Sequence, residues 1–208
     1  MQFGVIRGTL CAAAALLCLS TVSHAAQGDA ASGKKKFYTC LGCHGIEGYN
    51  NVYPTYNVPR TLHQNAAYII AALNEYKAGE RPHGTMHAQA SSLSDQDIAD
   101  IAAYLQSGEA VKPTTDVVGT TPPQAATCVA CHGTNGTGVD APMDPKPPIL
   151  AGQHYDYLLQ AIDSYRLGRR KNAVMNGMAA TLKSEAEVKA IAHFFASQKS
   201  PLSVVPRP

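Results

Sequence analysis

The feature that most constrains this chain of 208 residues is that one pattern occurs in it twice. Residues 40–45 (CLGCHG) recur 88 positions later as residues 128–133 (CVACHG). Residues 68–93 match 157–182 in the same order, at an offset of 89. Because the offset changes by single residues, the chain is a tandem duplication of one module of roughly 85–90 residues, which is near the small end of domain sizes.

Each module predicts three helices and no alternating strand pattern. The first helix leads into the cysteine pair, and the second ends at a glycine (Gly79 or Gly168), as a left-handed C-cap requires. The third begins at a serine that an acidic residue follows three positions later, which is the pattern of a capping box. The expected helices are residues 30–40, 66–78 and the stretch from Ser94, then 122–131 (with Thr121 as N-cap), 155–167 and the stretch from Ser184. The predicted fold class is all-α.

The two cysteines of each pair, followed at once by a histidine, match the motif for covalent haem attachment. Both sulfurs can form thioethers along one porphyrin edge, and the histidine reaches the iron from the same side. A thioredoxin-like pair needs a βαβ context, a zinc site needs four converging ligands, and a disulfide leaves both histidines unexplained. We therefore expect two covalently bound haem c groups, attached at Cys40, Cys43, Cys128 and Cys131, with His44 and His132 as axial iron ligands.

The sixth iron ligand decides between an electron carrier and a haem enzyme. Met86 follows its histidine by 42 residues and Met175 follows its own by 43, so both are the expected axial ligands. Met178 is a rival for the second iron, three residues further along. Three other side chains are weaker candidates: His83 and His87 are expected to face solvent, and Met143 to pack in a loop. A thioether at the sixth position leaves no site for a substrate.

Three further pairs of polar or conformationally restricted residues recur at the offset of 89. Arg81 and Arg170 could pair with haem propionates or simply end a helix in solvent. The carbonyls of Pro59 and Pro148 could accept the imidazole N–H of the ligand histidines and so orient them. Gln64 and Gln153 are expected to cap turns, and residues 34–36 (KKK) to form a solvated helix face.

The amino terminus is typical of an export signal. Arg7 precedes an apolar stretch at residues 10–19, and Ser23-His24-Ala25 offers small residues for cleavage near Ala25. Neither Cys11 nor Cys18 follows the small residue that a lipoprotein signal requires. A retained anchor is the alternative. We expect a periplasmic protein with a signal peptide at 1–25, domains at 26–108 and 122–208, and a polar linker at 109–121.

The charge balance gives no reason to expect a nucleic-acid partner, because the formal charge of the whole chain is only +2. The two halves differ, however: residues 26–110 carry −2 and residues 111–208 carry +3. Opposite surface potentials steer different partners, so the halves are expected to face different redox proteins.

The sequence resembles the cytochrome c4 type of dihaem class I cytochromes c. The resemblance covers the chain after the signal segment and depends on the two Cys-x-x-Cys-His-Gly motifs, the Pro-x-x-x-x-Gln stretches and the Arg…Met…Leu series of each module. It implies two cytochrome c domains with His/Met-ligated haems that exchange electrons with terminal oxidases. There are two departures from the repeat: Thr121 stands where the first module has Gly33, and Leu62-His63 replaces Ala151-Gly152.

The leading functional hypothesis is an electron carrier, with membrane-bound respiratory complexes as donors, a terminal oxidase or reductase as acceptor, and no small-molecule substrate. The alternative is the dihaem subunit of a dehydrogenase, such as a flavocytochrome sulfide dehydrogenase. A peroxidase-type enzyme would need an open iron site, against which the paired methionines argue.

Overall fold

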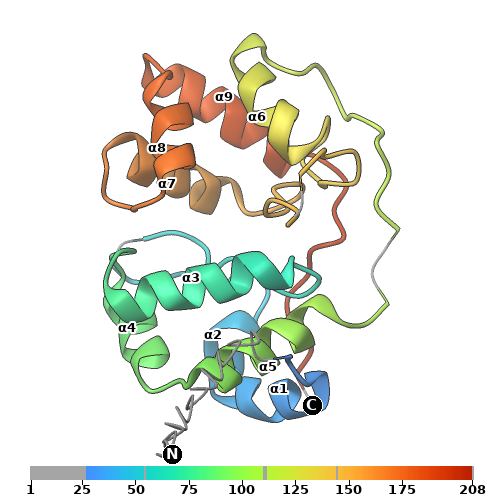
Figure 1. The fold of residues 1–208 in the computed structure, drawn as a ribbon. Coiled ribbons are helices and arrows are strands. Elements are labelled where there is room, and N and C mark those ends of the chain that lie inside the picture. The colour runs from blue at the N-terminus through green and yellow to red at the C-terminus, as the bar shows by residue number, and fades with distance from the viewer. Residues whose placement is uncertain (1–26, 54, 110–111, 144, 208) are drawn as a thin grey trace, which may run out of the picture.

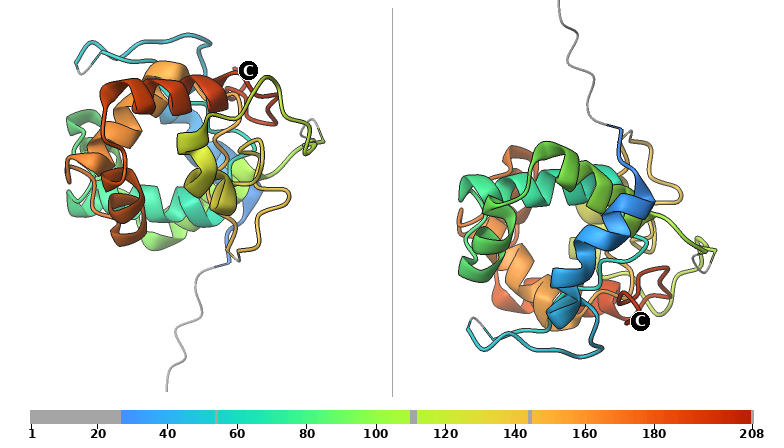
Figure 2. Two further views of the ribbon diagram at one scale, coloured as in Figure 1. Left: turned by 90° about the horizontal axis from the view of Figure 1, so that it is seen from above. Right: turned by 90° about the horizontal axis from the view of Figure 1, so that it is seen from below.

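The computed structural model describes residues 27–53, 55–109, 112–143 and 145–207, so the expected signal peptide lies outside the described residues. The described chain is helical, and its only β-type pairings are two isolated bridges, Asn50–Asn57 and Leu62–Ser203. Figure 1 shows two helical modules, with the N-terminal one below and the C-terminal one above. Views from above and below show the modules lying one over the other (Figure 2). The prediction of an all-α protein built from two modules is confirmed.

The first module contains two long helices, α3 and α5, and several short ones. Its elements are α1 (Ala30–Lys36), the 3₁₀-helix η1 (Phe37–Cys40), α2 (Leu41–His44), α3 (Ala66–Ala78), α4 (Gly84–Ser91) and α5 (Asp95–Gln106). The second module repeats this order without a counterpart of α1 in the described residues. Its elements are the 3₁₀-helix η2 (Pro123–Ala125), α6 (Ala126–His132), α7 (Tyr155–Arg166), α8 (Ala173–Ala180) and α9 (Glu185–Ala196).

The local signals at the helix ends act as predicted. Gly79 and Gly168 take left-handed φ values of 76° and 67° after α3 and α7. Ser94 and Ser184 begin α5 and α9, and both form complete capping boxes with the acidic residue three positions on. Each box satisfies two backbone N–H groups that the first turn of a helix leaves free.

Two expectations about helices are wrong. Thr121 caps nothing: Pro122 precedes η2 and Ala125 precedes α6, and neither makes a side-chain cap. The expectation of only three helices in each module is also wrong, because Met86 and Met175 lie in the additional short helices α4 and α8. Neither α4 nor α8 is among the three helices expected in each module, and each carries the predicted methionine ligand.

Close packing of α1 on α5 distinguishes the first module. Gly33 lies so near α5 that a Cβ there would stand 1.9 Å from the Asp100 carbonyl oxygen. In the second module, which has no counterpart of α1 in the described residues, the segment 112–121 is held by residues that follow α6 and α9. The Gln198 side chain exchanges hydrogen bonds of 2.8 and 2.9 Å with the backbone of Val118, and Asn135 donates to the carbonyls of Thr114 and Asp116.

The two modules meet through a reciprocal pair of glutamines. The Gln64 amide exchanges two hydrogen bonds, of 2.8 and 3.0 Å, with the backbone of Ile149 in the second module. Gln153 makes the same pair, both of 2.9 Å, with the backbone of Arg60 in the first. Because Gln64 and Gln153, and likewise Arg60 and Ile149, are 89 positions apart, the interface has approximate twofold symmetry. Each glutamine also accepts from the next backbone N–H, so the predicted turn-capping role is confirmed but incomplete.

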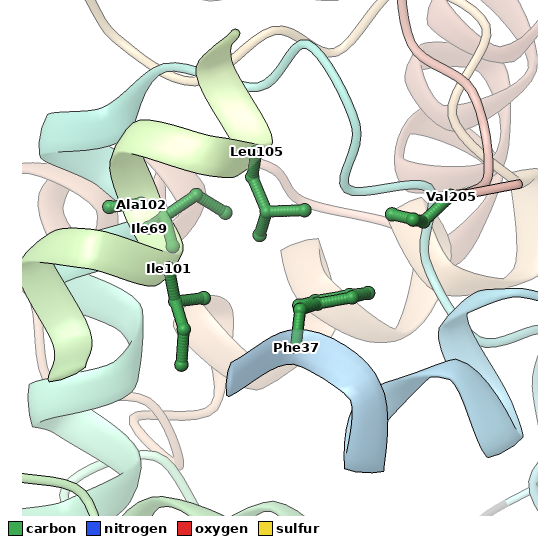
Figure 3. Packing of buried hydrophobic residues seen from close by; sticks show 6 residues of the cluster. All are labelled: Phe37, Ile69, Ile101, Ala102, Leu105 and Val205. Atoms are coloured by element: carbon green, nitrogen blue, oxygen red, sulfur yellow. The ribbon is translucent and has the colours of Figure 1, made fainter. Parts of the chain in front are cut away.

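The end of the chain returns to the first module. After α9 the backbone runs down to the lower body, where the C-terminus lies near α1 and α2 (Figure 1). Ser203 and Leu62 exchange two backbone hydrogen bonds of 3.1 and 3.3 Å. Val205 is 1% exposed and completes the first core with Phe37, Ile69, Ile101 and other α5 side chains (Figure 3). No helix in the described part of the chain has the length and apolarity needed to span a membrane.

Candidate functional site

Each module encloses a cavity that gathers its predicted site residues. Cys40, Cys43, His44 and Met86 line a cavity of about 190 Å³ in the first module. Their counterparts line a larger cavity, of about 310 Å³, in the second; these are Cys128, Cys131, His132 and Met175. None of these four cysteines forms a disulfide, and each is half-buried. All eight residues singled out from the sequence therefore lie in the expected two groups of four.

Both histidines are oriented by a proline carbonyl of their own module. The His44 Nδ1 lies 3.2 Å from the Pro59 carbonyl oxygen, and the His132 Nδ1 lies 2.9 Å from that of Pro148. A carbonyl only accepts, so Nδ1 carries the proton and Nε2 keeps its lone pair. Burial lowers the pKa of both histidines, although the hydrogen bond to the carbonyl opposes it. The predicted hydrogen bonds are confirmed, and they leave each ring in the tautomer that a metal ligand needs.

The two methionines occupy the same position in their helices, the third residue of α4 and of α8. The side chain of the preceding N-cap residue accepts from the methionine N–H, at 3.3 Å from His83 and 3.0 Å from Asn172. His83 is half-buried, so the expectation that it faces solvent is wrong. Met178 also lines the second cavity and is 40% exposed, so it remains a rival of Met175.

His87 and Asn176 do one structural job in the two modules. The His87 Nδ1 donates to the Tyr76 carbonyl at 2.8 Å, and the Asn176 amide donates to the Tyr165 carbonyl at 2.6 Å. Each bond ties the methionine helix to the end of the preceding long helix. His87 is exposed as expected, and its ring is engaged in this bond rather than free.

Arg81 and Arg170 are buried, so the reading of them as solvated helix ends is wrong. Each lines the cavity of its own module and lies against tyrosine rings. Glu75 is 3.9 Å from Arg81, and no described carboxylate lies within 4.0 Å of Arg170. The Arg81 Nε is buried without a hydrogen-bond partner. A buried cation without a full set of acceptors calls for an anion, and the carboxylate of a haem propionate at the cavity edge would supply one.

A wall of aromatic residues separates the two cavities, and sequence reasoning missed it. Pro59, Tyr68 and Tyr157 line both cavities. The Arg81 guanidinium donates across the boundary to the Tyr157 hydroxyl at 2.6 Å. Burial alone would raise the pKa of Tyr157, but the positive charges of Arg81 and Arg170 outweigh it and lower the pKa to about 8. The repeated tyrosine at the start of each second helix was the available signal, but repetition alone does not reveal a shared wall.

The residues present fit a covalent haem in each module. The cavity walls are mainly apolar, as a porphyrin face requires, and a pair of thiols lies in each wall for the two thioethers. Each cavity is also lined by an oriented histidine imidazole, a methionine thioether and a buried arginine that could pair with the propionates. Every group that a His/Met-ligated haem c needs from a protein is present twice.

Comparisons with known proteins agree with this arrangement. The Cytochrome c family profile matches residues 30–109 and 123–199. Cytochrome c4 of Pseudomonas aeruginosa is 32% identical over 197 residues, covering 86% of this chain and 92% of the relative. A protein of Stutzerimonas stutzeri named thiosulfate dehydrogenase electron acceptor is 30% identical over 212 residues, covering 89% and 93%. The crystal structure of reduced recombinant cytochrome c4 from Pseudomonas stutzeri superposes with a TM-score of 0.63 at 30% identity, covering 83% of this chain and all of that one.

Proposed function

Because the chain belongs to the cytochrome c family, and within it to the dihaem cytochrome c4 type, we propose that it carries single electrons in the periplasm between respiratory donors and a terminal oxidase or reductase. Its cofactors are two covalently bound haem c groups. The proposal assigns His44 and Met86 to one iron and His132 and Met175 to the other. The observation that carries it is that a Nδ1-protonated histidine and a helix-borne methionine line each of the two cavities.

The protein's own groups restrict the chemistry to electron transfer. Bound haem supplies an iron that accepts and releases one electron. The thioethers from the cysteine pairs hold it in place, and the proline carbonyls fix the imidazole planes, so little has to move when the charge changes. The soft methionine sulfur favours the ferrous state and leaves no open position for a substrate.

The shared wall suggests how an electron passes between the two centres. Tyr68 and Tyr157 contribute to both cavities, so only one layer of side chains separates the two sites there. Arg81 reaches across the module boundary to Tyr157, and the reciprocal glutamines hold the boundary closed. A fixed boundary keeps the distance between the two centres constant, as a carrier that passes each electron from one centre to the other requires.

The ligand assignment predicts separate spectral losses for the two methionines. In the oxidised holoprotein, Met86→Ala and Met175→Ala should each remove about half of the absorption band that arises from sulfur-to-iron charge transfer, because each removes one of two thioether ligands. After reduction, each variant should also bind carbon monoxide at one ferrous iron, while the reduced unaltered protein binds none at neutral pH.

Met178→Ala is the matched control, because Met178 lies in the same cavity and helix as Met175. It should leave the band intact. If Met178→Ala loses half of the band and Met175→Ala keeps all of it, the second ligand is Met178. Carbon monoxide binding to both irons of the unaltered protein would contradict the proposed electron-carrier function.

The two cavity rims suggest different partners. In the second module, the exposed lining residues include three apolar side chains (Met143, Val174 and Met178) besides Thr127 and Asn172, and the exposed Arg169 and Lys171 are sequence neighbours of the lining residue Arg170. In the first, the exposed lining residues are uncharged and polar (Thr39, Thr85, Gln89 and Ser92). We propose that a redox protein with an acidic rim docks on the second module. Its association rate should fall with salt more steeply than that of the partner of the first module; equal salt responses would refute this.

A second candidate function is the electron-accepting subunit of a dehydrogenase. The similarity to a protein named thiosulfate dehydrogenase electron acceptor supports this candidate. It also favours a thiosulfate dehydrogenase over a flavocytochrome as the catalytic partner. Copurification distinguishes the two functions. A catalytic subunit that stays bound through gel filtration would support the role of dehydrogenase subunit. A free monomer that membrane donors reduce would support the role of independent electron carrier.

A further inference from the structure

The carbonyl of the predicted ligand histidine is satisfied in different ways in the two modules. In the second module, the His132 carbonyl accepts from the N–H of Gly138 at 2.9 Å, six residues away in the same loop. In the first, the His44 carbonyl accepts from the N–H of Val205 at 3.2 Å, at the far end of the chain. The last carbonyls of a helix need partners from outside the helix. The first module thus obtains this partner from a segment that follows the whole second module.

Two hydrogen bonds fasten the segment 203–207, which we call the C-terminal strap, to helix α2, which contains Cys43 and His44. Besides the bond to His44, the guanidinium of Arg207 donates to the Leu41 carbonyl at 3.4 Å. The strap also passes close to Gly45, where a Cβ would stand 3.2 Å from the Val205 carbonyl oxygen. The strap therefore contacts both ends of α2 and the residue after it.

The side chain of Val205 provides a second route to the histidine. Val205 packs in the same core as Phe37 (Figure 3), and the Phe37 ring centroid lies 6.3 Å from that of His44. The second module has Ala125 at the position of Phe37. Val205 and Phe37 thus pack beside the first histidine, and the second module has no phenylalanine at the equivalent position.

We propose that the C-terminal strap is a positioning segment for His44, so that the first iron site depends on the end of the chain while the second is self-sufficient. The proposal rests on the proposed His/Met ligation only for its spectroscopic consequence. Loosening the strap frees the carbonyl end of α2 and lets the His44 ring turn, which weakens the hold on the first iron. Release of the strap would therefore open one iron site of the carrier and not the other.

The test is a truncation of the holoprotein after Leu202, which keeps Leu202 in its cluster with Ile149 and Ala151. Amide hydrogen exchange measured by mass spectrometry should rise at least about fivefold in residues 41–48, as expected for losing a net hydrogen bond, and stay unchanged in residues 129–136. After reduction, carbon monoxide should bind at one ferrous iron per molecule.

Point variants separate the two routes and guard against general unfolding. Val205→Pro removes the N–H donor and Val205→Ala removes side-chain packing, so both should raise the exchange in residues 41–48. Val205→Ile keeps the N–H donor and a branched apolar side chain, and should behave like the unaltered protein. Pro206→Ala is the control, because Pro206 is exposed beside Val205. Unchanged exchange in residues 41–48, or an equal rise in both segments, would overturn the proposal. If the unaltered protein already binds carbon monoxide at both irons, the electron-carrier function fails, while the exchange measurement still decides the role of the strap.

Discussion

Lys36 and Asp100 show how single side chains hold α1 on α5. The Lys36 ammonium lies 2.6 Å from carboxylate oxygens of both Asp97 and Asp100, so this lysine is not part of a solvated face as expected. The backbone N–H of Asp29 donates to Asp100 at 2.8 Å. This hydrogen bond, followed by the one from Lys36, lowers the pKa of Asp100 to about 2.

The depressed pKa of Asp100 predicts an acid-sensitive first module. A carboxyl group whose pKa is lower in the folded protein contributes stability above its unfolded value, about 3.9, and loses it as the pH falls toward 2. The free energy of unfolding, measured with denaturant at pH 5 and pH 2.5, should therefore drop with acid. Asp100→Asn should be less stable than the unaltered protein at pH 5 and show a smaller drop.

The fully exposed side chain of Asp95 provides the control for this experiment. Asp95→Asn should reproduce the acid response of the unaltered protein. An Asp100→Asn variant with the full acid response would show that other carboxyl groups are responsible.

Among the elements, the long helices were predictable and the methionine helices were not. Helix α3 begins and ends at the predicted residues, because its apolar positions and its terminal glycine are local signals. α4 and α8 are eight residues each, and α4 opens with Gly84. So short a helix depends on its neighbours more than on its own propensity. Asn172 is a good N-cap type and could have revealed α8, whereas His83 in the equivalent place is not.

The contact of α1 with α5 predicts a strict requirement for glycine at position 33. A Cβ at Gly33 would overlap the Asp100 carbonyl group, and both are backbone positions that cannot turn aside. Gly33→Ala should lower the free energy of unfolding by about 1–3 kcal/mol, as overpacking does. Denaturant titration of the holoprotein measures this.

Gly84→Ala is the matched helical control, since nothing lies within 4 Å of its added Cβ. It should cost no stability, because alanine is the better helix former. Equal losses in both variants would mean that the close approach of α1 and α5 is not what position 33 requires.

At the scale of the whole molecule, the sequence pattern predicted the two modules and their site residues, but not the contacts between the modules. Gln64 and Gln153 gave a signal through their repetition, yet the same residue type also suits a turn. Val205 lies in an irregular tail with no periodicity. Contacts between residues 85 or 161 positions apart depend on the packed fold, which no local pattern encodes.

The reciprocal glutamines predict that the modules unfold together. Gln64→Ala leaves the buried N–H and carbonyl of Ile149 without partners, at a cost of about 1–3 kcal/mol. The double variant with Gln153→Ala should separate the single thermal transition into two, as scanning calorimetry would record. Gln89→Ala, on an exposed face of α4, is the control. One sharp transition in the double variant would show that the C-terminal strap suffices to couple the modules.

The symmetry of the glutamine contacts also bears on how such a chain could arise. Gln64 binds Ile149, and Gln153 binds Arg60. Ile149 and Arg60 are equivalent positions, each four residues before the glutamine of its own module. A single module therefore carries both halves of the contact. An ancestor of half the length would already have possessed a face able to pair with its own copy. Joining two such copies by gene fusion would then have required no new interface, and later divergence could give each copy its own task.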